Sequence, residues 1–303
     1  MAVISTGNIS KALMPGVNAW YGLAYNQYPT QYSEIFDMER SEKNFEEDVN
    51  MNGFGLAKLK NEAMNIDYTD ASQSLVQRYV HATYALGYIL SRENIEDNQY
   101  MGLAEQMTKA LANSMRQTKE NVGANVLNRG FNSSYVGADA IELFSQVHLR
   151  TKGGTFANEL ATAADLSEAS LEQACIDIQK FKDDAGLTLS AMPRKLIIPV
   201  ELQFEAERIL KSSLQNDTAN NALNALKNRG ILPDGVAVNQ YLTDADAFFI
   251  KTDVSNGLKH MQRRDAAMEN DTDFDSENVK FKCTERYAFG WTDPRGAFAS
   301  AGA

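Results

Sequence analysis

The chain has 303 residues, of which 44% are hydrophobic and 23% are charged, and its formal net charge is −11. This size and apolar content suit one large domain or two ordinary ones and exclude wholesale disorder. The acidic balance argues against a protein that binds nucleic acid tightly, because phosphate binding needs clustered Lys and Arg. Neither a signal peptide nor a stretch of about 18 apolar residues occurs, so we expect a soluble protein without a membrane partner.

The first segment, residues 1–52, predicts an arm rather than a domain. It is rich in aromatic residues and in Asn and Gln, it has no regular hydrophobic period, and Pro15, Gly16 and Pro29 interrupt it. Aromatic side chains without a core of their own indicate a segment that lies on another surface. That surface is either the segment's own domain or a neighbouring subunit.

Residues 53–92 predict a long hairpin with two extended limbs and a polar tip near residues 65–74. In its second limb, residues from Val76 to Leu90 alternate in one phase. Nothing within such a hairpin can pack against both of its faces, so we expect it to project. Its polar residues are candidate contacts for assembly, namely Lys58, Lys60, Asp67 and Asp70.

Residues 93–150 begin with a long helix that Asp97 or Asn98 is expected to cap and that Gly130 is expected to end. About 30 residues at 1.5 Å each give a rod of roughly 45 Å. Its predicted apolar stripe comprises Leu103, Met107, Leu111, Met115, Thr118, Val122 and Val126.

Residues 151–246 predict a separate compact region of the α+β class. A first helix is expected to start at a capping pair of Asp165 and Glu168 and to end at Gly186. A short buried strand, "RKLIIPV", follows it, and a second helix is expected to turn Phe204 and Leu210 inward. A third helix, "NNALNALKNRG", and the strands "VAVNQY" and "AFFI" complete the pattern.

Residues 247–303 contain a strand of unusual length. In "VKFKCTERYAFGW", every second residue from Val279 to Trp291 shares one largely apolar face. Ordinary strands have about five or six residues, and this one matches the length of the long helix. We therefore predict that the strand and the helix pack together as an elongated plank.

The motifs of nucleotide and nucleophilic chemistry are absent from the sequence. "TKGGT" at residues 151–155 lacks the spacing of a phosphate-binding loop, and the isolated His81, His148 and His260 predict structural or surface roles. Cys175 and Cys283 favour buried free thiols, with a bridge between them left open. We accordingly expect no cofactor and no enzymatic activity.

An acidic cluster near the C-terminus is the one weak candidate for a metal site. Asp271, Asp273 and Asp275 occupy the first, third and fifth positions of an EF-hand loop, but the sixth is Ser276 instead of Gly and the twelfth is Lys282 instead of Glu. A solvated loop between two strands is the favoured interpretation. Glu277 adds a fourth carboxylate, and neighbouring cations that could neutralise the cluster are Arg263, Arg264, Lys280 and Lys282.

Three stretches together resemble one family, the tailed-bacteriophage major capsid proteins with the Hong Kong 97 fold. They are "ADAIELFSQVHLRTKGGTF" after the long helix, the strand and helix in "MPRKLIIPVELQFEAERIL", and the closing "KFKCTERYAFGWTDPRGAF". The resemblance implies an N-terminal arm (1–52), an E-loop hairpin (53–92), a P-domain with the spine helix (93–150), an A-domain (151–246) and returning P-domain strands (247–303).

The resemblance also implies a function. The chain would be a structural subunit that self-assembles, as pentamers and hexamers, into the icosahedral head of a tailed phage after synthesis in the host cytoplasm. The shell would enclose double-stranded DNA without sequence-specific binding, and its acidic wall would repel that DNA. Expected partners are a separate scaffolding protein, a portal and a decoration protein. The scaffolding protein is expected to be separate because the chain starts with the arm and leaves no room for a scaffolding domain. The E-loop and the acidic loop would contact neighbouring copies, the latter near threefold positions.

Two other functions stay open at this point. A shell of the encapsulin type, which encloses enzyme cargo, shares the fold, but the start of the chain, broken by Pro and Gly, lacks the amphipathic helix that often binds cargo. A metal-dependent hydrolase would use the cluster at residues 271–275 and would need further ligands that the sequence does not supply.

Overall fold

The structure is a computed structural model that describes residues 18–51, 53–62, 65–66, 68, 73–93, 100–214 and 223–303. Its first elements are α2 (Tyr32–Ile35), β1 (Asp37–Arg40), β2 (Phe45–Met51), β3 (Gln73–Val80), β4 (Ala82–Leu90), α4 (Tyr100–Asn128), β5 (His148–Leu149), β6 (Thr155–Phe156) and α5 (Glu168–Gln179). They are followed by β7 (Pro193–Ile198), α6 (Gln203–Lys211), α7 (Ala225–Arg229), β8 (Val236–Val238), β9 (Phe248–Thr252), β10 (Leu258–Thr272), β11 (Val279–Trp291), a 3-10 turn (Pro294–Gly296) and β12 (Ala297–Ser300).

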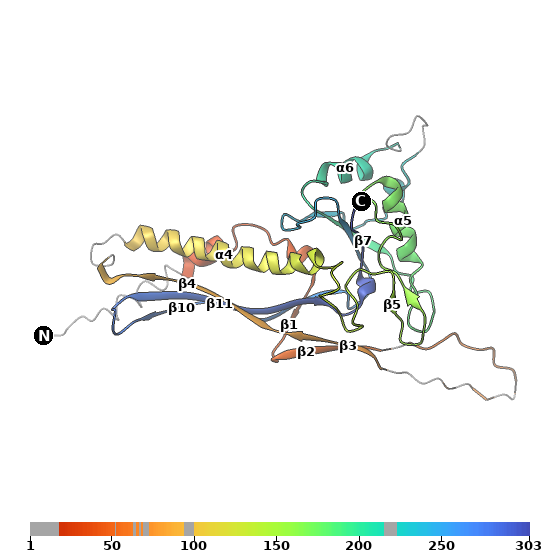
Figure 1. The fold of residues 1–303 in the computed structure, drawn as a ribbon, viewed down its shortest axis with the longest axis horizontal. Coiled ribbons are helices and arrows are strands. Elements are labelled where there is room, and N and C mark those ends of the chain that lie inside the picture. The colour runs from red at the N-terminus through yellow and green to blue at the C-terminus, as the bar shows by residue number, and fades with distance from the viewer. Residues whose placement is uncertain are drawn as a thin grey trace.

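The first part of the molecule is the plank, which we define as α4 lying along a sheet of order β1-β10-β11-β4 (Figure 1). Strand β11 has 13 residues and α4 has 29. At about 3.3 Å and 1.5 Å per residue, both elements span roughly 43 Å. The long strand, the long helix and their pairing into a plank are thus confirmed.

Strand β11, in the sheet of the plank, follows the predicted alternation of buried and exposed residues. In β11, Val279, Phe281, Cys283, Glu285 and Tyr287 are all buried, and Lys280 and Lys282 are exposed. Both long neighbours, β10 and β4, run antiparallel to β11. Period-two alternation therefore gave the buried face correctly from Val279 to Tyr287, but beyond it Ala288 and Gly290 are buried and Phe289 and Trp291 are only half-buried.

The helix turns a somewhat different face toward the sheet than its apolar stripe predicts. Leu111 and Met115 are buried, but Met107 is 43% exposed, so the expected row against β11 is wrong at that position. Some buried positions of the helix are polar, because the sheet offers them polar partners: Thr108 contacts Tyr88, and Lys119 donates to Glu285. The buried positions are Ala104, Thr108, Leu111, Ala112, Met115, Lys119, Glu120, Ala124 and Leu127.

The ends of this helix differ from expectation in one respect. The predicted caps, Asp97 and Asn98, lie outside the described residues. Gly130 follows the helix as predicted, but its φ is not among the positive ones. A Cβ at Gly130 would lie 2.5 Å from the ring of Phe144, so close packing, not a left-handed turn, requires glycine here.

The described part of the arm packs on its own chain. Residues 18–25 are helical, and Tyr21, Ile35 and Phe36 are buried against the plank. Strand β1 pairs in parallel with β10. Of the two surfaces that the sequence left open, the chain's own domain is therefore the one this segment covers.

The predicted hairpin is displaced along the sequence. Its first limb is β2, which lies within the range predicted for the arm and pairs with β3. The second limb breaks at His81, and β4 leaves the hairpin to pair with β11. The break also changes the buried phase, because Tyr79 is buried while Val80 is 67% exposed. We call the β2–β3 unit, with the described residues between the two strands as its tip, the hairpin.

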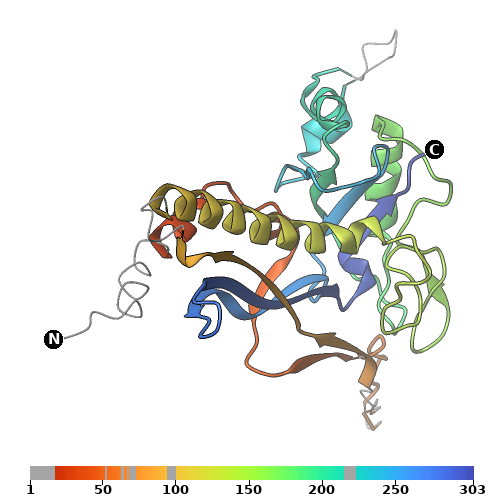
Figure 2. The same cartoon turned by 60° about the vertical axis from the view of Figure 1, so that its left-hand side comes forward.

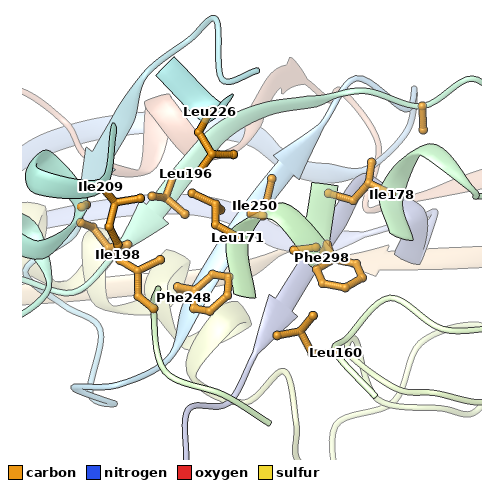
Figure 3. Close-up of a cluster of buried hydrophobic side chains, with 14 of the residues drawn as sticks. Leu160, Leu171, Ile178, Leu196, Ile198, Ile209, Leu226, Phe248, Ile250 and Phe298 are labelled. Carbon is orange, nitrogen blue, oxygen red and sulfur yellow. The ribbon is translucent and has the colours of Figure 1, made fainter. Parts of the chain in front are cut away.

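The second part of the molecule is the compact domain, a sheet of order β12-β9-β7-β8 with α5, α6 and α7 beside it (Figure 2). Strand β9, which corresponds to the predicted strand "AFFI", pairs with β7 and with β12, so β12, expected among the returning strands of the plank, belongs to this sheet instead. Their apolar side chains meet those of α5 and β7 in a continuous core (Figure 3), which includes Leu171, Ile178, Leu196, Phe248 and Phe298.

Three local expectations for the compact domain are corrected. Ser167, not Asp165, caps α5, and it forms a capping box with Ser170. The helix ends at Gln179, and Gly186, with a φ of 87°, lies in a later turn. Phe204 is 69% exposed, because α6 buries Ala206 and Ile209 instead.

Candidate assembly surfaces

The hairpin presents apolar side chains to solvent. It extends from the plank beneath the compact domain in Figures 1 and 2. Leu56 and Leu59 are 82% and 90% exposed. Apolar side chains gathered on a projection mark a surface that another protein covers. Its other large exposed apolar residues are Met51, Phe54, Ile66 and Tyr68 and, along the limbs, Phe45, Val49, Leu75, Val76 and Val80.

The predicted polar contacts of the hairpin are placed only in part. Lys58 and Lys60 are both exposed on the irregular limb after β2. Asp67 and Asp70 lie outside the described residues. The structure therefore presents two of the four candidates on the surface of the tip.

A buried group of polar side chains fixes the base of the hairpin to the plank. Lys259 Nζ donates to Asp48 Oδ2 at 2.6 Å and pairs with Glu39 at 3.0 Å. Thr292 donates to the same Asp48 oxygen, and Tyr79 contacts Thr292 at 2.6 Å. Burial alone would lower the pKa of Lys259, but its bonds to the two carboxylates outweigh that effect and raise it.

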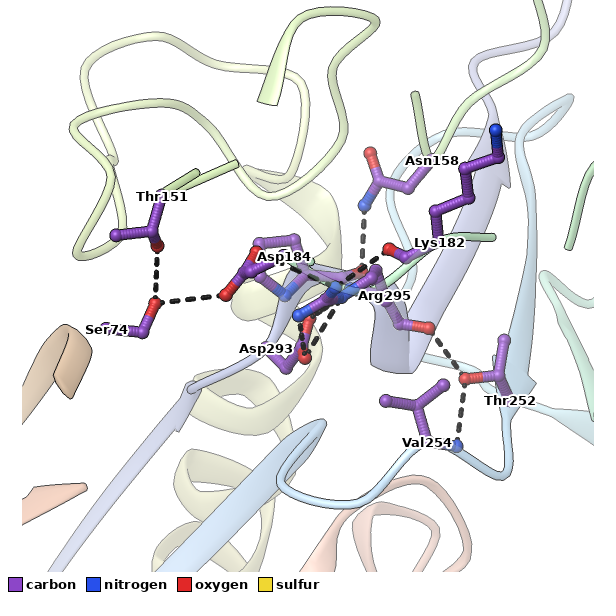
Figure 4. A network of polar contacts seen from close by, with 10 residues as sticks. Ser74, Thr151, Asn158, Lys182, Asp184, Thr252, Val254, Asp293 and Arg295 are labelled. Carbon is purple, nitrogen blue, oxygen red and sulfur yellow. Dashed lines mark hydrogen bonds and ion pairs between the residues drawn. The ribbon is translucent and has the colours of Figure 1, made fainter. Parts of the chain in front are cut away.

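A second contact joins the hairpin to the compact domain. Ser74 Oγ lies 3.2 Å from Asp184 Oδ2 and 2.7 Å from Thr151 Oγ1 (Figure 4). Beside them, Arg295 is almost fully buried and makes paired hydrogen bonds to Asp293. The base is thereby held from two sides, and the apolar tip is presented beyond it.

The two points where the chain enters and leaves the hairpin touch each other. His81 Nε2 and Ser41 Oγ are 2.9 Å apart, and Ser41 donates to Glu46 Oε1 at 2.8 Å. Burial lowers the pKa of His81, and the neighbouring Arg286 lowers it further. A neutral imidazole therefore closes this junction.

Charged side chains lie buried between α4 and the sheet. Lys119 Nζ donates to Glu285 Oε1 at 2.6 Å and to Gln262 Oε1 at 2.8 Å. Lys119 and Glu285 are 5% and 2% exposed, so the pair is shielded from solvent. Tyr25 of the arm donates to the other oxygen of Glu285 at 3.2 Å. One ion pair thus joins the arm, the helix and both long strands.

The next residue of the helix holds the arm in a different way. The carboxylate of Glu120 accepts the backbone N–H groups of Gln31 and Tyr32 at 2.8 Å and 3.0 Å. Burial raises the pKa of Glu120, although these two donors act in the opposite direction. Helix α2 therefore receives its N-terminal acceptor from the plank and not from its own sequence.

The acidic cluster forms the turn between β10 and β11 at one end of the plank. Lys280 pairs with Asp273 at 2.5 Å, and Arg92 pairs with Glu277. Bonds to Lys280 lower the pKa of Asp273. The carboxylate of Asp271 accepts the backbone N–H of Thr272, and the backbone N–H of Asp275 donates to Asp273 Oδ1. Phe274 stands among these carboxylates and is 96% exposed.

The other cations expected near this cluster are placed elsewhere within one chain. Arg263 donates to the carbonyl of Ser41, Arg264 to Thr284, and Lys282 pairs with Glu269 at 2.9 Å. Lys280 is thus the one predicted partner that the described chain brings to the turn. Among the described residues, no three His, Cys, Asp or Glu side chains converge to hold a metal ion.

The histidines and cysteines take structural places. Both ring nitrogens of His148 have partners, Asp139 Oδ2 at 2.6 Å and the carbonyl of Leu143 at 3.2 Å. His260 departs from expectation, because it is fully buried and neither ring nitrogen has a hydrogen-bond partner. Cys175 and Cys283 are buried free thiols. Within the described chain, no helix is long and apolar enough to span a membrane.

Sequence reasoning missed the groups that fix the surfaces in place, above all Lys119, Glu285, Asp48 and Lys259. Glu285 carried a signal, since it is the one charged residue on the inward face of β11. Its partner comes from a helix more than 160 positions away, and no local pattern identifies such a pairing.

Comparisons with known proteins agree with this architecture. A family model described as phage capsid protein matches residues 75–300. No curated protein sequence gives a significant match. The fold is similar to the capsid of bacteriophage JBD30 decorated with minor capsid protein trimers, with a TM-score of 0.54 and 15% identity over 71% of this chain and 92% of that chain.

Two further structures share the fold. The procapsid of bacteriophage JBD30 gives a TM-score of 0.51 at 14% identity, covering 98% of this chain and 76% of that chain. A virus-like particle from Pyrococcus furiosus gives 0.51 at 10% identity, covering 94% and 97%. The class that the fold defines is the shell-forming subunit of the Hong Kong 97 type.

The family model spans most of the chain, and the chain therefore belongs to the phage capsid protein family. The resemblance to tailed-phage major capsid proteins is confirmed, and the chain is a structural subunit of a capsid shell. The encapsulin alternative has no better support, because the similarity to the virus-like particle is one of fold.

Proposed function

We propose that this subunit assembles as pentamers and hexamers into an icosahedral head that encloses the double-stranded DNA of a tailed phage. The observation that carries the proposal is the hairpin, whose base is fixed by partly buried bonds of Asp48 and Ser74 while its tip exposes Leu56 and Leu59. A rigid projection with uncovered apolar side chains fits a neighbouring copy as its partner.

The domain roles follow from this arrangement. The compact domain, including β9 and β12, serves as the A-domain at the capsomer centre, and the plank serves as the P-domain. The acidic turn, with Asp271, Asp273, Asp275 and Glu277, approaches other copies near threefold positions. Lys58, Lys60, Arg263 and Arg264 are further assembly contacts, and Asp67 and Asp70 of the tip stay proposed from the sequence alone.

The partners and the setting complete the proposal. The subunit is non-enzymatic, is made and assembled in the host cytoplasm, and works with a separate scaffolding protein, a portal and a decoration protein. Its net charge of −11 supports an inner wall that repels DNA and does not bind it.

Charged substitutions in the hairpin test this proposal. Leu56→Asp with Leu59→Asp should leave a folded subunit, because both side chains are exposed and support no core, but should abolish closed shells in electron micrographs. Leu59→Met, which keeps the apolar surface, is the matched control and should assemble. Normal shells from the double aspartate variant would contradict the proposed role of the hairpin.

A further inference from the structure

The glycine-containing turn "TKGGT" borders a hollow in the compact domain. The sequence alone indicates no role for this turn. Arg150 follows β5, and Thr155 begins β6, so the turn closes a two-strand hairpin. Gly153 and Gly154 have φ angles of 100° and 85°, which side chains other than glycine rarely adopt.

The second glycine also makes room for the guanidinium of Arg150. A Cβ at Gly154 would lie 2.4 Å from Arg150 Nη2. The Nε atom of Arg150 is buried and has no hydrogen-bond partner. Leaving a buried donor unpaired costs about 1–3 kcal/mol and more for a charged group, so this cation is poised for a ligand that the single chain does not supply.

The hollow beside Arg150 has a volume of about 490 Å³ and is positively charged at this side. Lys182 also lines it, and neither cation forms an ion pair among the described residues. Of its two acidic lining residues, Asp177 is paired with Lys180 at 3.6 Å. Burial raises the pKa of the other, Glu159, which disfavours its negative charge.

We propose that this hollow binds an oxyanion, held by the guanidinium of Arg150 and the ammonium of Lys182. Arginine binds planar carboxylate and phosphate groups through two parallel N–H bonds, and lysine adds a point charge. The hydroxyl of Thr155 lines the same hollow and offers a further donor.

Two sources supply such a group, free phosphate and a carboxylate side chain of a neighbouring copy. The second source rests on the proposed shell, in which an acidic chain offers many carboxylates, and Asp271 and Asp275 form no ion pair among the residues that the structure describes. The turn also touches the base of the hairpin, since Lys152 Nζ donates to the carbonyl of Gly53 at 3.2 Å and Thr151 contacts Ser74. Occupancy of the site therefore acts next to the assembly element.

Calorimetric titration of the free, full-length subunit with sodium phosphate, against sodium chloride at equal ionic strength, tests the first source. We expect saturable binding that Arg150→Gln abolishes and Lys182→Gln weakens by about tenfold, the loss of roughly 1.4 kcal/mol. Lys152→Gln, in the same turn but directed to Gly53, is the matched control and should bind as the parent does. If Arg150→Gln does not fold, Arg150→Lys keeps the charge, loses the paired bonds and should bind more weakly.

Heat stability of assembled shells tests the second source. If a neighbour's carboxylate fills the site, Arg150→Gln shells should dissociate at lower temperature than Lys152→Gln shells, and phosphate should destabilise parent shells by competition. Failure of every variant and of the parent to form shells would count against the proposed function and leave the phosphate titration decisive. Identical behaviour of Arg150→Gln and Lys152→Gln in both experiments would overturn the inference.

Discussion

The compact domain and the plank bury their side chains in different ways. The compact domain gathers residues such as Leu171, Ile198 and Phe298 into one continuous apolar core. The plank divides its apolar contacts among smaller clusters and places the Lys119–Glu285 ion pair between helix and sheet. On its outer face, Ile89 is 59% exposed. The difference teaches that the compact domain supplies stability, whereas the plank supplies length and fixed geometry for contacts with other copies.

The largest expected effect comes from the apolar cores. Phe298→Ala should lower the free energy of unfolding by about 3–5 kcal/mol, since truncating a fully buried aromatic removes its contacts and leaves a cavity. Phe281→Ala, in a small cluster of the plank, should fall at the lower end of that range because its surroundings can collapse more readily. Urea unfolding of the free subunit measures both. A larger loss for Phe281→Ala would reverse the comparison.

The buried ion pair gives the next effect. Lys119→Met should cost about 3–5 kcal/mol, because it leaves the carboxylate of Glu285 buried and uncompensated. Adding Glu285→Leu should recover most of that loss. Lys109→Met, which breaks the exposed pair with Glu105 on the same helix, should cost less than about 1 kcal/mol. Equal losses for Lys119→Met and Lys109→Met would show that the centre of the plank is solvated.

Acid should weaken the plank through His260. Burial, with a smaller contribution from Lys119, lowers the pKa of His260 to about 3, against about 6.5 in an unfolded chain. Between these values the unfolded chain holds a proton that the folded one lacks. Stability should thus fall by about 1.4 kcal/mol per pH unit below pH 6.5 and level off near pH 3.

The control for this pH effect is His260→Phe, which keeps an aromatic ring beside Tyr32, Tyr287 and Phe289. Its unfolding free energy should depend less steeply on pH over the same interval. Parallel pH profiles for parent and variant would exclude His260 as the source of the acid sensitivity.

The smallest expected effect concerns the acidic turn at the end of the plank. Lys280→Gln should change the stability of the free subunit by less than about 1 kcal/mol, because its pair with Asp273 is half exposed. In shells, contacts between carboxylates and cations should weaken as salt rises and should ignore a chelator. Loss of shell heat stability in chelator, restored by calcium, would instead assign a shared metal to Asp271, Asp273 and Asp275.

The sequence predicted the elements whose signals are local and regular. The alternation from Val279 to Trp291 identified β11 and, as far as Tyr287, its inward face, and helix length identified the plank. The apolar periodicity of α4 failed at Met107, and it also missed two buried charged positions of the helix, Lys119, whose partners lie in the sheet, and Glu120, whose partners lie in the arm. Those partners lie far apart in sequence, so no window of residues contains the information.

The hairpin shows the same limit at a strand boundary. Its projection agrees with the prediction, but β2 lies in the range predicted for the arm, the break at His81 has no signal in the sequence, and the described part of the tip exposes apolar side chains. An alternating pattern runs through residues 76–90 without interruption. The pairing of β4 with β11 and of β3 with β2 decides where the hairpin ends, and strand pairing depends on the whole fold.

Hydrogen–deuterium exchange of the free subunit and of assembled shells tests the central claim most directly. The account predicts strong protection of β7, β9 and α5 in both states, because their core lies within one chain. Amides of the hairpin limbs, β2 and β3, and of the turn at residues 273–278 should gain protection only in shells. Equal protection of the hairpin in the free subunit and in shells would contradict the claim that neighbouring copies cover it.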